Sequence, residues 1–108
     1  MTEAGARRAD MALADVVEMD HHGRPSFRIK GRIFATLMTP GKMNLMPGLD
    51  GIMDAVDAHP EVCSELWWGS RLAAVQVDLA TVEPALLQEL LAAAYAFKAA
   101  GPRRMRPT

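Results

Sequence analysis

The stretch Pro25-Ser-Phe-Arg-Ile-Lys-Gly-Arg-Ile-Phe-Ala-Thr-Leu37 decides the fold of this chain, because it predicts two strands joined by a tight turn. A two-residue turn at Lys30-Gly31 suits an antiparallel hairpin, since glycine tolerates a positive φ. With that turn, Phe27 is predicted to lie opposite Phe34. Directly opposed residues share a sheet face, so the two rings should be buried together.

A second turn is predicted at Thr39-Pro-Gly-Lys42, where proline fixes φ and glycine supplies a positive φ. It would place Met38 opposite Met43. Counting outward from both turns assigns every strand residue to a face. The face expected to meet the helices carries Phe27, Ile29, Phe34, Thr36, Met38, Met43 and Leu45. The other face carries Arg28, Ile33, Ala35, Leu37, Lys42 and Asn44.

The remaining chain supplies helices and further strands around this unit. Before the hairpin we expect a helix from Glu3 to about Ala14 capped by Thr2, a short strand Val16–Met19 and a turn Asp20–Gly23. After the sheet we expect a helix Leu49–Ala58, with a further helical turn or two over Glu61–Leu66. A strand Ala73–Leu79 then leads to a long helix, which is capped by Thr81 and ends at Gly101. The buried stripe of that last helix is predicted to be Leu87, Leu90, Leu91, Ala94 and Phe97.

These elements predict an α+β fold with a small antiparallel sheet of about five strands, flanked by helices and ending in a long C-terminal helix. Residues 1–101 are expected to form one domain, and residues 102–108 a disordered basic tail. The 108 residues carry a net charge of −1, so a nucleic-acid site would have to be a local basic patch. A single cysteine and the lack of a signal-like N-terminus favour a cytoplasmic protein.

From Leu13 to Phe97 the chain resembles the bacterial MmcQ/YjbR-like family. The most specific parts are Arg24–Leu37 and Val75-Gln-Val-Asp-Leu79, followed by the leucine-rich helix. The resemblance implies a YjbR-like α+β domain, comparable to double-wing DNA-binding folds and to secretion-chaperone-like folds. Relatives commonly carry a basic residue and then a tryptophan before the segment that matches Val75 to Leu79. Here Arg71 supplies the charge, whereas the tryptophans come earlier, at Trp67 and Trp68.

Basic and aromatic residues near the predicted turns form the candidate nucleic-acid site. They are Arg24, Arg28, Lys30, Arg32, Lys42, Trp67, Trp68 and Arg71. Basic side chains on hairpin ends can grip phosphates, and tryptophans can stack on bases. Charged turns also occur simply to keep sheet edges soluble. For the two tryptophans, strand alternation favours one structural and one partly exposed ring.

Other residue groups offer little chemistry. His59 and Cys63 lack the paired spacing of a zinc site and a group that would orient a catalytic base. We therefore expect no catalytic residues, no metal and no cofactor. The leading hypothesis is a non-enzymatic protein that binds DNA weakly and without sequence preference, and no membrane is expected as a partner. The alternative is a chaperone-like module that binds a protein or peptide through the aliphatic strip Ile33, Ala35 and Leu37.

Overall fold

The computed structural model describes residues 1–38 and 40–101, which form an α+β domain. The helices in this part of the chain are α1 (Glu3–Met11), α2 (Gly48–Ala58) and α3 (Pro84–Ala100). The strands are β1 (Val17–His21), β2 (Arg24–Ile29), β3 (Arg32–Met38), β4 (Lys42–Leu45), β5 (Cys63–Trp68) and β6 (Arg71–Asp78). The predicted fold class is confirmed, with six strands in one sheet rather than about five.

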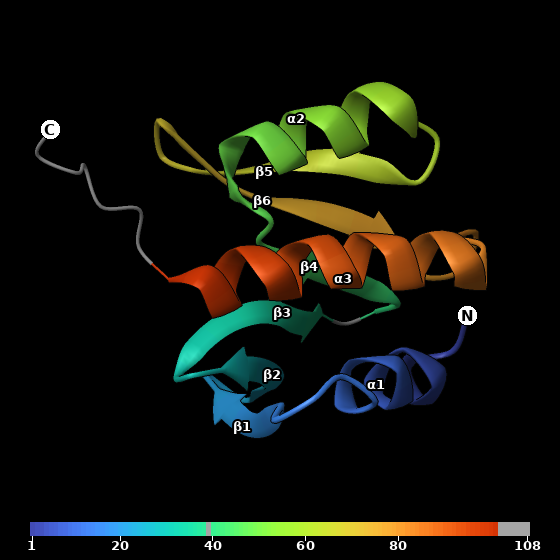
Figure 1. The fold of residues 1–108 in the computed structure, drawn as a ribbon. Helices are drawn as coiled ribbons and strands as arrows, with labels where there is room; N and C mark the ends of the chain where they lie inside the picture. The colour runs from blue at the N-terminus through green and yellow to red at the C-terminus, as the bar shows by residue number, and fades with distance from the viewer. Residues whose placement is uncertain (39, 102–108) are drawn as a thin grey trace, which may run out of the picture.

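The strands are all antiparallel neighbours in the order β1-β2-β3-β4-β6-β5. The three helices pack on one face of this sheet, with α3 lying along β3 and α2 lying over β5 and β6 (Figure 1). The core fills the space between the helices and the sheet. Its largest fully buried side chains include Phe27, Phe34, Met43, Leu45, Ile52, Leu87 and Leu91.

The two ends of the sheet differ in what they carry. One end, at the left of Figure 1, brings together the Lys30-Gly31 turn, the Gly69-Ser70 turn, the start of α2 and the end of α3; we call it the open end. The other end carries the connection between β3 and β4 and the turn at His22-Gly23; we call it the closed end. Consecutive hairpin turns lie at opposite ends because each antiparallel strand reverses direction.

The predicted turn at Lys30-Gly31 is confirmed, with Ile29 opposite Arg32. Both turn residues have a positive φ, 52° at Lys30 and 78° at Gly31, which is the geometry of a primed hairpin turn. Beyond the turn a β-bulge inserts one extra residue into β3, so Phe27 pairs with Ala35 and the predicted pairing with Phe34 is wrong. Phe27 and Phe34 are nevertheless both fully buried, as the shared-face prediction required.

The second predicted register is also wrong by one residue. The connection between β3 and β4 spans residues 39–41, so Met38 pairs with Lys42 and Leu37 with Met43. The earlier bulge in β3 turns the side chains that follow it to the opposite face. Ala35 and Leu37 are therefore buried in the core, and the exposed aliphatic strip expected for a protein-interaction module is not formed. The shorter connection returns Met43 and Leu45 to the buried face, as predicted.

A row of polar side chains crosses the other face of the sheet in register. It consists of Ser26, Thr36, Asn44, Gln76 and Ser64 on five successive strands. The Gln76 amide donates to Asn44 Oδ1 over 3.0 Å, and Ser26 Oγ donates to the Met19 carbonyl over 2.8 Å. None of the described helices lies on this face. Thr36, which was predicted for the helix-covered face, belongs to this polar row instead.

Several predicted boundaries require correction. The segment expected to continue the middle helix, Glu61–Leu66, instead begins edge strand β5 at Cys63. Helix α1 ends at Met11 instead of near Ala14, and its predicted cap Thr2 is confirmed. Helix α3 begins at Pro84, and its N-cap is Glu83 instead of the predicted Thr81. Within α3, Leu87, Leu91 and Ala94 are buried, Leu90 is half-buried, and Phe97 is half-exposed. The predicted tail at residues 102–108 lies outside the described residues.

Among the described helices, none has the length and apolar character that crossing a membrane requires.

Candidate functional site

The structure separates the eight predicted site residues into two groups. Lys30, Arg32, Trp67, Trp68 and Arg71 lie at the open end, and Arg28 lies two residues from the same turn. Arg24 begins β2 at the closed end, and Lys42 begins β4 there. The seven residues of β3 separate the two ends by about 20 Å, at roughly 3.3 Å per residue. The predicted cationic cluster is therefore not one surface.

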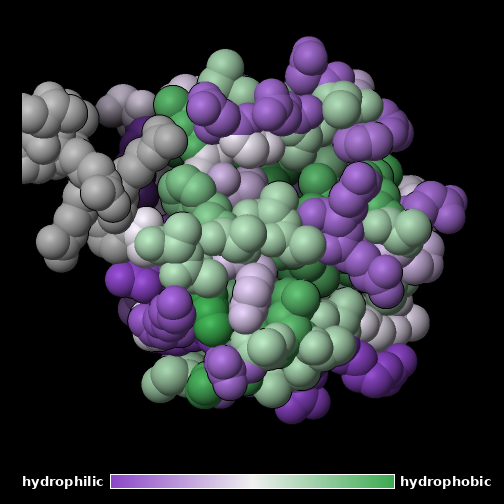
Figure 2. Space-filling view, in the orientation of Figure 1, coloured by the Kyte–Doolittle hydropathy of each residue, from purple (hydrophilic) through white to green (hydrophobic). Residues whose placement is uncertain are grey.

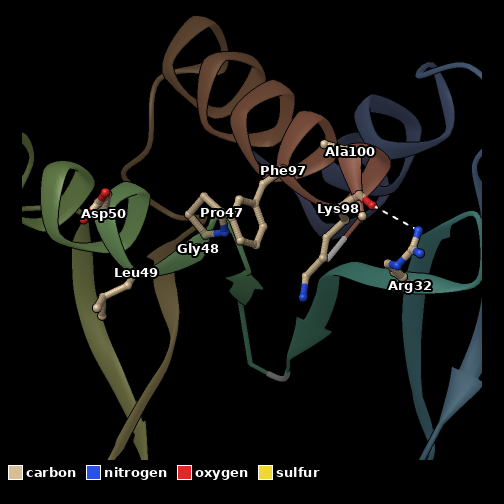
Figure 3. A pocket seen from close by; sticks show the side chains of 9 residues that line it. Arg32, Pro47, Gly48, Leu49, Asp50, Phe97, Lys98 and Ala100 are labelled. Carbon is tan, nitrogen blue, oxygen red and sulfur yellow. Dashed lines mark hydrogen bonds between the residues drawn. The ribbon is translucent and has the colours of Figure 1, made fainter. Parts of the chain in front are cut away.

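The cations of the Lys30-Gly31 turn contact the C-terminus of α3. Lys30 Nζ donates to the Ala99 carbonyl over 3.2 Å, and Arg32 Nη1 donates to the Lys98 carbonyl over 3.5 Å (Figure 3). The last carbonyls of a helix carry a partial negative charge, so these contacts are favourable. They bring no carboxylate to the two side chains, and the local charge remains positive.

A groove runs across the open end between α2, α3 and the hairpin of β5 and β6. It consists of a cavity of about 760 Å³ and a second cavity of about 510 Å³, which share Gly48, Leu49, Phe97 and Lys98. Arg32 and Asp50 line the first cavity, and Trp67 and Arg71 line the second. Cavities of this size are typical of ligand sites. We refer to the two cavities together as the open-end groove.

Phe97 forms the wall that the two cavities share. Its ring lies against Pro47 and Gly48 at the start of α2 (Figure 3). Gly48 has a φ of +84°, and a Cβ built there would lie 2.5 Å from Phe97 Cε1. Glycine is thus required both for the backbone turn and for the approach of the ring. Because Gly48 has no side chain, the Phe97 ring can lie directly over the first turn of α2.

Three large hydrophobic side chains of the groove are about half exposed to solvent. Leu49, Trp67 and Phe97 are 58%, 51% and 49% exposed, although they are large hydrophobic residues. Apolar side chains occupy much of the middle of the helix-covered face, with polar ones around them (Figure 2). Exposed apolar surface rimmed by polar residues is typical of interaction sites.

Each aromatic side chain at the open end has a charged neighbour. The Arg71 guanidinium lies 5.8 Å from the centre of the Trp68 ring, and Lys98 Nζ lies 5.7 Å from the centre of the Phe97 ring. The Trp67 indole N–H donates to Glu65 Oε1 over 3.1 Å, which orients that ring. Trp68 is 52% exposed, so the expectation of one structural tryptophan is wrong.

The other predicted cations have different surroundings. Lys42 Nζ lies 3.5 Å from Asp78 Oδ2, and the two residues are directly paired across β4 and β6. Arg28 Nε donates to Ser26 Oγ over 3.2 Å and thus reaches the face that carries the polar row. Neither side chain lines the open-end groove.

The surroundings of Cys63 do not activate its thiol. Cys63 is buried, and burial together with the charge of Glu61 raises the pKa of its thiol, which keeps it protonated. His59 Nδ1 lies 3.9 Å from Glu61 Oε1, and Cys63 begins strand β5, so the two residues do not share a helix. In the described ranges, no three histidine, cysteine, aspartate or glutamate side chains gather closely enough to hold a metal ion.

Comparison with known proteins finds no matching family, no matching curated protein and no matching solved structure.

The groove residues missing from the predicted site include three whose side chains line both cavities, Leu49, Phe97 and Lys98. Phe97 was predicted to be a core residue because it continues the apolar stripe of the last helix. Gly48 was the one feature of the sequence that could have indicated the position of Phe97. A glycine at the first position of a helix indicates a backbone conformation that other residues avoid, and such a position can also admit a close neighbour.

Proposed function

We propose that this chain is a non-enzymatic nucleic-acid-binding protein that contacts its ligand at the open end of the sheet. The observation that carries the proposal is the environment of the cations there. Arg71 and Lys98 lie beside aromatic rings, and Arg32 contacts a backbone carbonyl. In the described part of the chain, none of the three has a carboxylate within ion-pair distance. Their charge is available to phosphate.

The net charge of −1 limits the expected affinity, because long-range attraction of a polyanion is weak. Binding at physiological salt should be micromolar or weaker, on the order of ordinary non-specific binding. The resemblance to the MmcQ/YjbR-like family is consistent with this proposal.

The test compares two double variants that remove the same charge. Arg71→Ser with Lys98→Ser alters the open end, whereas Arg24→Ser with Lys42→Ser alters the closed end. Titration of a labelled oligonucleotide at low salt should show a loss of about tenfold or more for the open-end pair and less than about twofold for the closed-end pair. Raising salt from about 50 to 200 mM should weaken the parent about 20- to 40-fold if some three phosphates are contacted.

Two outcomes would overturn the proposal. One is no binding by the parent at low salt, in which case the exposed apolar side chains of the groove point to a protein ligand instead. The other is an equal loss in both double variants, which would mean that binding follows net charge and has no defined site. Circular dichroism and thermal melting of each variant establish that a lost signal is not unfolding.

A further inference from the structure

We infer that the open-end groove takes single-stranded nucleic acid, with unpaired bases placed on Trp67 and Phe97. This inference rests on the proposed function and adds the class of ligand. It starts from the aromatic rings, which phosphate contacts alone leave unexplained. A protein that grips only a backbone needs cations, yet this groove exposes about half of each ring.

Rings and cations line the same two cavities. Lys98 and Phe97 form one adjacent pair at the wall between the two cavities. Arg71 and Trp67 line the second cavity together. A nucleotide has the same composition, with a flat apolar base joined to a charged phosphate. Surfaces that bind single strands combine stacking aromatics with a cationic track in this way.

A duplex does not match these features. Its bases are stacked on one another, so their faces are unavailable to Trp67 or Phe97 unless a base is flipped out. The groove is also concave and small, with cavities of about 760 and 510 Å³, which suits unpaired nucleotides better than the side of a double helix. Duplex binding at the open end would use the cations alone.

Trp67 is held ready for stacking. Its indole N–H is bound to Glu65 and its ring remains half-exposed, so little side-chain freedom is lost when a base arrives. Phe97 is likewise fixed by its position over Gly48. Asp50 lines the first cavity and Glu65 accepts the hydrogen bond of Trp67, so both carboxylates would repel a backbone placed beside them. The phosphates are thus expected on the Arg71 and Lys98 side, with the bases inward.

The experiment measures three ligands on the full chain: a single-stranded oligonucleotide, the duplex of the same sequence, and a free mononucleotide. The parent should prefer the single strand over the duplex by about fivefold or more, since stacking of one base on an aromatic ring is worth that much or more. The mononucleotide should bind far more weakly than the oligonucleotide, because it engages fewer of the ring and cation pairs.

Variants at one position separate stacking from mere packing. Trp67→Leu keeps an apolar side chain and removes the ring face, and it should weaken single-strand binding about fivefold while duplex binding stays within about twofold. Trp67→Phe keeps a ring face and should retain most of the affinity. In a Trp68→Phe background Trp67 is the single tryptophan, and stacking should quench its fluorescence on addition of the single strand.

Each result decides one level of the argument. If neither nucleic acid binds at low salt, the proposed function and this inference both fail. If single strand and duplex bind equally and Trp67→Leu changes neither, the proposed function stands and the inference is wrong. If the mononucleotide binds as tightly as the oligonucleotide, the groove is a small-ligand site and the single-strand assignment is wrong.

Discussion

The two ends of the sheet use their charged residues differently. At the closed end Arg24 is exposed, but Lys42 and Glu3 make contacts within the chain. Lys42 pairs with Asp78, and the Gly41 amide donates to Glu3 Oε2 over 2.9 Å, which ties the connection between β3 and β4 to α1. At the open end the cations meet carbonyls and rings, and large apolar side chains stay exposed.

The difference shows how a small domain can separate stability from binding. Contacts that satisfy a charge inside the chain make it unavailable to a ligand, so the same residue type has opposite roles at the two ends. The closed end should therefore be sensitive to mutation in stability measurements, and the open end in binding measurements. Three predictions test that division, beginning with the largest effect.

The largest effect is expected from Asp10, a buried residue of α1, the helix that contacts the closed end through Glu3. The carboxyl is fully buried, and both of its oxygens lack a hydrogen-bond partner among the described residues. Burial, and to a smaller extent the negative charge of Glu18, raise the pKa of Asp10 from 3.8 to about 8. The folded protein therefore holds this proton over a pH range in which the unfolded chain releases it.

The sign of the pH dependence follows from that difference. Because the folded state binds the extra proton, the contribution of Asp10 to stability is retained below about pH 4, decreases as the pH rises, and is lost above about pH 8. Asp10→Asn removes the titration. Relative to the parent, the variant should gain up to about 5 kcal/mol of unfolding free energy between acidic and alkaline pH. Urea unfolding of both proteins across this range measures the gain, and parallel curves would contradict the prediction.

Much of the fold could be predicted from local patterns, and the errors have specific physical causes. The Lys30-Gly31 turn and the cap at Thr2 follow from residues within a few positions of each other. The β-bulge after Ile33 adds one residue to β3, whereas the connection at 39–41 is one residue shorter than the predicted turn, and no local pattern in the sequence indicated either change. Since faces alternate residue by residue, the bulge reversed the predicted positions of Ala35 and Leu37, and the shorter connection returned Met43 and Leu45 to their predicted face.

The candidate site was harder to predict than the fold. Residue types near turns correctly indicated Arg32, Trp67 and Arg71 as surface residues of one end. Their grouping with Lys42 failed, because closeness along the chain was taken for closeness in space. The contributions of Phe97 and Lys98 depend on α3 ending beside α2, which is a tertiary contact between segments about 50 residues apart.

The second prediction concerns Glu3 at the closed end. Glu3→Ala removes the acceptor of the Gly41 amide and an acidic residue from the first turn of α1, where it interacts favourably with the helix dipole. The expected cost is about 1–2 kcal/mol, or a fall in Tm of roughly 5–10 °C for a domain of this size. Glu89→Ala is the matched control, because Glu89 is exposed on α3 and makes none of these contacts in the described structure.

Thermal melting of the two variants decides whether the closed end contributes this stability. If Glu3→Ala and Glu89→Ala melt together, the contact between Glu3 and Gly41 contributes nothing measurable and the contrast between the ends is weaker than we argue. Binding of the oligonucleotide should be unchanged in Glu3→Ala, because the site of that mutation is separated from the open-end groove by the length of β3.

The smallest effect is expected from Lys30 at the open end, where stability has not been optimised. Its φ of 52° is unfavourable for a lysine, whereas asparagine accepts this conformation and Asn-Gly is the preferred pair for such a turn. Lys30→Asn should raise stability by about 0.5 kcal/mol, even though it gives up the exposed contact with the Ala99 carbonyl. Lys30→Ala loses the same contact without the conformational gain, so it should be slightly less stable than the parent.

Chemical denaturation that ranks asparagine above lysine and lysine above alanine would support this account. Equal stabilities for the asparagine and alanine variants would show that the backbone at Lys30 carries no strain. If oligonucleotide binding weakens equally in both variants, Lys30 contributes its charge to the ligand, and the turn retains lysine for binding at a small cost in stability.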